Sequence, residues 1–97
     1  MNQNRNQALP DGITRSQLLT AAGEFDKLGL PVGYKPSHSY DVEIDGKLYP
    51  PPAIVALAAK ALTGALPEPG FRAGVGTKCF QILEDAGFSI RRKVKDD

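Results

Sequence analysis

The clearest pattern of apolar and polar positions lies between Ser39 and Val55. Apolar side chains at positions 40, 42 and 44 alternate with carboxylates at 41 and 43, which is the period of a strand with one solvent-facing side. Asp45-Gly46 then offers the positive φ angles of a two-residue type I′ turn. Residues 47–49 predict a short returning strand, which ends at consecutive prolines because proline has no amide hydrogen for the ladder. We therefore expect a β-hairpin that leads directly into a helix.

The first helix is expected to begin at Thr14 and to end at Gly29. Residues 14–17 form a capping box, and glycine at the other end can adopt the left-handed conformation that closes a helix. An apolar stripe runs along it, from Leu18 through Phe25 to Leu28. The agreement between the start signal and the stop signal supports these bounds.

A second helix is expected from about Pro52 to Thr63 and a third from roughly Gly76 to Ala86. Apolar residues cover more than half of the circumference of the second helix, so it should be the most buried. They are Ile54, Val55, Leu57, Ala58, Ala61 and Leu62. A last strand is expected over residues 88–90, extending towards Val94.

These elements predict an α+β fold in the order αββααβ. An isolated hairpin is only marginally stable in water, so the last strand should join it in a three-stranded antiparallel sheet packed on three helices. We expect a flexible N-terminal arm over residues 1–11, a single domain over 12–95 and a tail over 96–97.

The composition of the 97 residues narrows the class of protein. The formal net charge is +1, which neither marks nor excludes a nucleic-acid binder, and a single cysteine excludes an internal disulfide. No apolar run approaches the ~20 residues of a membrane span, and the first residues do not resemble a signal peptide. The expected location is the cytoplasm, without contact to a membrane.

The residues that most often carry catalysis give no support for an enzyme here. Cys79 lies on the apolar stripe of the third helix, and the only histidine, His38, lies in a polar loop. Carboxylates at 41, 43 and 45 fit a solvated strand face and turn better than a metal site. We therefore assign no catalytic residue, no metal ligand and no cofactor.

The glycine-rich stretch before the third helix is a candidate phosphate site. Amides of Gly74, Gly76 and Thr77 at a helix start could seat one backbone phosphate, with Arg72 and Lys78 adding charge. The stretch lacks the residue order of a nucleotide P-loop. The alternative is a structural connector whose glycines let the intervening aromatic side chain turn into the core.

Arg91, Arg92 and Lys93 form a second basic candidate, at the end of the last strand. Such a cluster contacts phosphates or an acidic partner, or it only protects an edge strand from aggregation. Aromatic side chains at 34, 40 and 49 fit stacking on bases, and they fit packing in the core equally well.

The hairpin and the following helix carry a family resemblance. The run from Tyr40 to Pro51 with Asp45-Gly46 and Tyr-Pro-Pro, followed by residues 53–58, resembles the N-terminal head domain of McrA-type modification-dependent HNH restriction endonucleases. The resemblance covers roughly residues 13–92. Two positions depart from the family pattern, because Pro52 replaces a lysine and Ala73-Gly74 replaces adjacent glycines. If that lysine contacts DNA in relatives, this chain lacks the contact.

The resemblance implies an accessory nucleic-acid-binding head without its enzyme. The function we expect is therefore a non-catalytic module that binds the DNA backbone in a bacterial or phage defence system. The alternative is a protein-interaction module, such as a phage-encoded inhibitor (anti-CRISPR-like or anti-restriction) of a nucleic-acid-targeting complex, which the near-neutral charge also fits. Binding to DNA that weakens steeply with salt distinguishes the first from the second.

Overall fold

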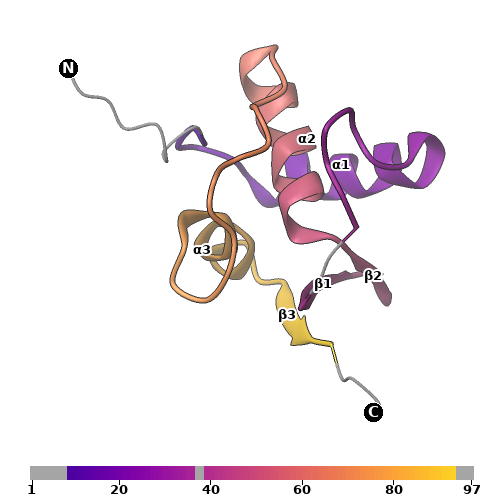
Figure 1. The fold of residues 1–97 in the computed structure, drawn as a ribbon, viewed down its shortest axis with the longest axis vertical. Coiled ribbons are helices and arrows are strands. Elements are labelled where there is room, and N and C mark those ends of the chain that lie inside the picture. Colours follow the sequence, from indigo (N-terminus) through magenta and orange to yellow (C-terminus); the bar gives the residue numbers. More distant parts are fainter. Residues whose placement is uncertain (1–8, 37–38, 94–97) are drawn as a thin grey trace.

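The computed structural model describes residues 9–36 and 39–93 and has the predicted α+β order (Figure 1). Its elements are α1 (Arg15–Leu28), β1 (Tyr40–Ile44), β2 (Lys47–Tyr49), α2 (Pro51–Thr63), α3 (Lys78–Asp85) and β3 (Ser89–Arg92). The predicted tail and most of the predicted arm lie outside the described residues, as does Val94. Within the described part of the arm, Leu9 is buried and belongs to the core cluster.

The sheet is antiparallel with the strand order β2-β1-β3, so the C-terminal strand joins the hairpin as predicted. Both central residues of the turn have positive φ, 51° at Asp45 and 82° at Gly46, as a type I′ turn requires. Val42 lies opposite Tyr49 on one side and Ile90 on the other. Because directly opposed residues point to the same face, this register collects the apolar side chains on one face of the sheet.

The caps of α1 confirm the predicted start and stop. The side chain of Thr14 accepts a hydrogen bond from the Gln17 amide (3.2 Å), and the Gln17 side chain accepts one from the Thr14 amide (3.0 Å). Gly29 ends the helix with a φ of 80°. α2 begins at Pro51, one residue before the predicted position, because Pro50 serves as its N-cap.

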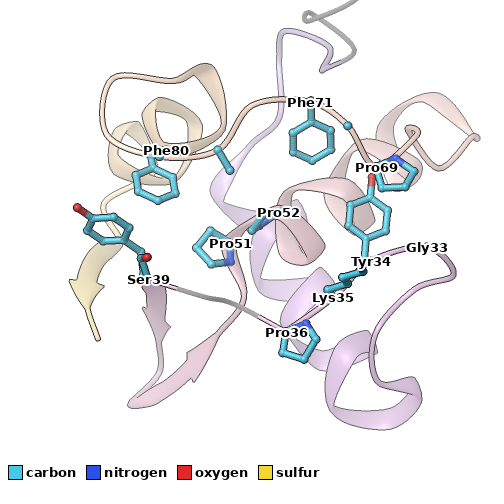
Figure 2. Close-up of a pocket in the computed structure, with 14 residues that line it drawn as sticks. Gly33, Tyr34, Lys35, Pro36, Ser39, Pro51, Pro52, Pro69, Phe71 and Phe80 are labelled. Carbon is cyan, nitrogen blue, oxygen red and sulfur yellow. The ribbon is translucent and has the colours of Figure 1, made fainter. Parts of the chain in front are cut away.

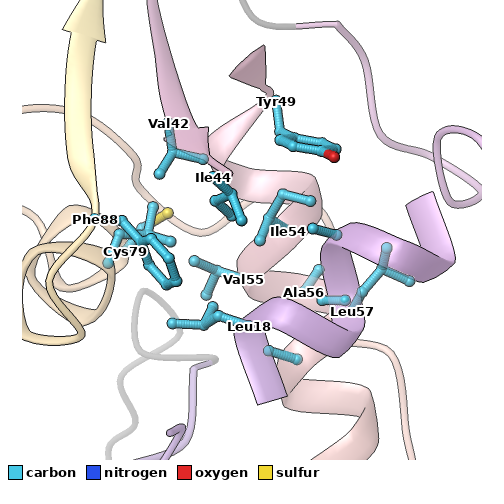
Figure 3. Close-up of a cluster of buried hydrophobic side chains, with 14 of the residues drawn as sticks. Leu18, Val42, Ile44, Tyr49, Ile54, Val55, Ala56, Leu57, Cys79 and Phe88 are labelled. Atoms are coloured by element: carbon cyan, nitrogen blue, oxygen red, sulfur yellow. The ribbon is translucent and has the colours of Figure 1, made fainter. Parts of the chain in front are cut away.

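α2 is the central helix, as predicted, and it packs most extensively against α1. Figure 3 shows Leu18 of α1 and Ile44 of β1 converging on Val55 of α2. The predicted apolar stripes were wrong at two helix ends. Leu28 is 75% exposed and Leu62 is 39% exposed, because the final turns of α1 and α2 extend past the core that the sheet and α3 cover.

The outer face of the sheet also departs from the prediction. Asp41 and Glu43 alternate with the core residues, as expected, but Asp41 is only 8% exposed. Arg91 lies opposite it in the register, and the ammonium of Lys93 lies 4.0 Å from its carboxylate. The carboxylate is therefore covered by basic side chains of β3 and the residue that follows.

Candidate nucleic-acid interface

The start of α3 is closed by Thr77, which acts as its N-cap. The Thr77 hydroxyl accepts hydrogen bonds from the amides of Phe80 (3.5 Å) and Gly74 (3.0 Å) and donates one to the Gly74 carbonyl (2.7 Å). The Thr77 amide also donates to the Gly74 carbonyl, at 3.2 Å. These contacts fold residues 74–77 into a compact turn that ends where α3 begins.

This turn uses two of the three amides that the sequence assigned to a phosphate. The amides of Gly74 and Thr77 are already bonded within the turn, whereas the Gly76 amide donates to no acceptor in the described part of the chain. The same holds for the amides of Lys78 and Cys79, the first two residues of α3. The amides without an acceptor at this helix start are therefore those of Gly76, Lys78 and Cys79, and of these only the Gly76 amide was predicted.

Lys78 is engaged with the segment that precedes α1. Its ammonium donates to the Leu9 carbonyl (3.0 Å) and to a carboxylate oxygen of Asp11 (2.7 Å). The hydrogen bond and the charge of Lys78 lower the pKa of Asp11. In this arrangement Lys78 holds the N-terminal segment against α3.

The basic run at the end of β3 is divided between the two faces of the sheet. The Arg91 guanidinium donates to Glu43 at 2.7 Å on the outer face, where Lys93 approaches Asp41. Arg92 lies opposite Tyr40 in the register, on the face that carries the core residues. The structure therefore does not present Arg91, Arg92 and Lys93 on one face of the sheet.

Four cations have neither an ion-pair partner nor a hydrogen-bond acceptor among residues 9–36 and 39–93. They are Lys27, Lys35, Arg72 and Arg92. One of these four lines a cavity and two are adjacent to residues that line it: Lys35 is in the lining, Arg72 stands between two lining residues, and Arg92 is the cross-strand neighbour of a third. The unpaired cations in or next to this lining are thus one residue from each basic candidate of the sequence, together with Lys35, which the sequence did not single out.

This cavity has a volume of about 450 Å³ and is lined mainly by aromatic and proline side chains. Figure 2 shows Tyr34 and Pro69 on one side of it, Phe80 on the other, and the prolines at the start of α2 between them. No carboxylate is among the described residues that line it. We call this space the aromatic cavity.

Two pairs of rings form its walls. Tyr34 and Phe71 lie 6.0 Å apart between ring centroids, and Tyr40 meets Phe80 edge to face at 5.4 Å. The Tyr34 hydroxyl donates to the Pro67 carbonyl (2.7 Å), and burial raises the pKa of Tyr34 to about 12. Phe71 is buried, as the alternative interpretation of the glycine-rich stretch predicted. Ring packing and hydrogen bonding hold these side chains in place around the space.

The third tyrosine belongs to the core and not to the cavity. The Tyr49 hydroxyl donates to the Asp26 carboxylate at 3.1 Å, and its ring packs edge to face on Phe25. Burial and the neighbouring carboxylate raise the pKa of Tyr49. Of the three tyrosines, the sequence alone could not say which would line a cavity.

The remaining reactive side chains show no site. Cys79 is fully buried, and burial raises the pKa of its thiol to about 12. His38 lies outside the described residues. No group of three metal-binding side chains occurs in the ranges that the structure covers. In those same ranges no helix combines the length and the apolar character needed to cross a bilayer.

Comparison with known proteins identifies the family of this chain. Residues 11–92 match the family described as the ScoMcrA-like N-terminal head domain. The family ties the chain to McrA-like restriction, which fits a role in defence. No curated protein and no solved structure shows significant similarity to the chain. Because the family match spans most of the 97 residues, the chain belongs to the ScoMcrA-like N-terminal head domains.

Proposed function

We propose that this head domain is a non-catalytic DNA-binding module of a restriction or defence system. The observation that carries the proposal is that Lys35 lines one cavity and that Arg72 and Arg92 adjoin residues of its lining, all three without acidic partners in the described chain. Cations that are not committed to carboxylates are the ones that can neutralise phosphates without first breaking an ion pair. DNA is the polyanion that a restriction-associated domain would meet.

The start of α3 supplements this charge. The unbonded amides of Gly76 and Lys78, which unlike that of the fully buried Cys79 belong to exposed or half-buried residues, could bind one backbone phosphate, because helix N-termini favour anions. Arg72 precedes the turn, and Gly74 of the turn also lines the aromatic cavity. Arg91, Lys93 and Lys78 would contribute only after releasing their present partners.

We include the term non-catalytic in the proposal because the cysteine of the chain is unsuited to act as a nucleophile. The thiolate is the reactive form of cysteine, and a thiol with a pKa of about 12 in a fully buried position is neither ionised nor accessible near neutral pH. The role of the module would be to place a partner enzyme on DNA.

The test is a fluorescence anisotropy titration of a labelled duplex with the wild-type chain and charge variants. Arg72→Gln and Arg92→Gln should each weaken binding by about tenfold, equivalent to ~1.4 kcal/mol. Lys27→Gln is the matched control, because Lys27 is also unpaired in the described chain but, unlike Arg72 and Arg92, is not adjacent to a residue that lines the cavity. Failure of the wild-type chain to bind duplex at low salt, or equal effects of all three substitutions, would reject the proposal.

A protein-interaction module is the second candidate, and exposed apolar side chains beyond α1 favour it. Leu28 and Val32 are 75% and 89% exposed, and with Leu30 they line a groove that also includes Leu66. Side chains of this kind gathered on one surface mark protein contacts more often than DNA contacts. Val32→Asp should abolish co-purification of a stoichiometric protein partner, while Val75→Asp, at a residue that is 78% exposed and outside the groove, should not.

A further inference from the structure

We propose that the aromatic cavity binds one unpaired nucleobase of a nucleic-acid strand. The inference rests on the proposed function and adds to it the kind of group that the module recognises. Pockets of about 300–1,000 Å³ with mostly apolar walls and a few polar groups are typical of small-ligand sites. The aromatic cavity, at about 450 Å³, has this size and this lining.

The floor of the cavity favours a neutral ring over a phosphate. Pro51 and Pro52 are the first residues of α2, and Pro50 is its N-cap. Proline has no amide hydrogen, so this helix start lacks two of the donors with which helix N-termini usually hold anions. What it offers is an apolar surface of rings between the aromatic walls (Figure 2).

The walls supply stacking surfaces. Tyr40 lines the cavity and is half-buried, so part of its ring remains open to contact. Its ring already packs against Phe80, so little side-chain freedom would be lost when a base stacks on it. Every base presents a π face, and stacking on an aromatic side chain strengthens binding whatever the base.

The rim favours a nucleic acid over a peptide as the source of the ring. Lys35 lines the cavity, Arg92 is the cross-strand neighbour of Tyr40, and Arg72 follows Phe71 directly. Among the described lining residues none is acidic, so a polyanion whose base enters the cavity would find cations for its phosphates. A proline-rich peptide would match the rings but would leave these charges unused.

The first experiment compares two labelled single strands of equal length, one with bases and one of abasic sites, by fluorescence anisotropy. They carry the same phosphates, so a cavity that takes a base should bind the strand with bases about tenfold more tightly. Tyr40→Leu should reduce that affinity to the abasic level and leave the abasic strand unaffected. Leu48→Ala, exposed on β2 and outside the cavity lining, is the matched control and should change neither.

The second experiment needs no variant, so it decides the question even if Tyr40→Leu fails to fold. Adenosine, which has no phosphate, is titrated into the ¹⁵N-labelled chain, with inorganic phosphate and a proline-rich peptide as separate arms. Adenosine should shift the amides of Gly33, Tyr34 and Gly70, which line the cavity. Phosphate should leave those amides in place.

The outcomes separate this inference from the proposed function. Equal binding of both strands with no adenosine shifts would overturn the base site and leave backbone binding intact. Adenosine shifts without affinity for any strand would support the base site and reject the DNA-binding module. Cavity shifts with the proline-rich peptide and none with adenosine would overturn the inference in favour of a peptide site.

Discussion

The salt dependence of duplex binding follows from the pairing of the cations. Each phosphate neutralised by a lysine or arginine releases counterions, and the logarithm of the affinity falls with the logarithm of salt by about 0.9 per contact. Lys35, Arg72 and Arg92 are unpaired around the aromatic cavity, whereas Lys78 and Arg91 hold carboxylates at 2.7 Å. Ion pairs must break before the latter two can contribute.

Three contacts give an expected slope of about −2.7, so affinity should fall roughly 40-fold between about 50 and 200 mM salt. If the five basic side chains that the sequence singled out all met phosphates, the slope would be about −4.5. These are Arg72, Lys78, Arg91, Arg92 and Lys93. Anisotropy titrations at four salt concentrations distinguish the two values.

Single substitutions locate the contacts. Arg72→Gln should reduce the size of the slope by about 0.9, because one contact is lost. Arg91→Gln should leave the slope unchanged, because Arg91 already donates to Glu43. A wild-type slope near −4.5, together with a slope of smaller magnitude for Arg91→Gln, would refute the argument that cations in ion pairs do not contact phosphates.

Three further predictions concern the scaffold. Thr77→Ala removes the cap of α3 and the bond to the Gly74 amide, and should lower the free energy of unfolding in urea by about 1 kcal/mol, with Thr77→Ser retaining most of it. Burial raises the pKa of Cys79 from 9.0 to about 12, so the unfolded chain loses its thiol proton first as pH rises. Stability should therefore be intact below pH 9 and fall on the order of 1 kcal/mol by about pH 10, an effect that Cys79→Val removes in urea titrations at both pH values. Tyr49→Phe deletes the hydrogen bond to Asp26 and should cost about 1 kcal/mol in the same assay.

For each of these three predictions, one experimental result would contradict the reasoning. An unchanged urea midpoint for Thr77→Ala would mean that the cap does not hold the helix start. A pH dependence that persists in Cys79→Val would assign the loss to other groups, of which Tyr34 is the first to examine because its pKa is also raised. A Tyr49→Phe variant as stable as the wild type would mean that water replaces the lost partner of Asp26.

Much of the fold was predictable because its signals are local. The turn at Asp45-Gly46 depends on two φ angles, and the cap at Thr14 depends on bonds to a residue three positions away. Neither needs knowledge of the tertiary structure. The exposed ends of α1 and α2 were not predictable in this way, because apolar spacing says which face is buried but not where the core ends.

The candidate site was predictable only in part. The partners of Lys78 and Arg91 lie 67 and 48 positions away, so their ion pairs depend on how distant segments dock. The division of the β3 run could have been foreseen, since neighbouring residues of a strand point to opposite faces. The aromatic cavity could not, because residues 33–36, 51–52 and 69–74 come together only in the folded chain.

The net charge of +1 conceals how the charges are distributed. Five ion pairs in the described chain join cations to carboxylates, two of them across the outer face of the sheet and three at contacts of α1, of α2 and of the N-terminal segment. These pairs occupy five carboxylates, whereas Lys35, Arg72 and Arg92 have no acidic partner in the described chain. A field that attracts a polyanion depends on the local sum of charges and on the low dielectric of the walls, and not on the total. A near-neutral chain can therefore present one positive surface where cations outnumber the carboxylates beside them.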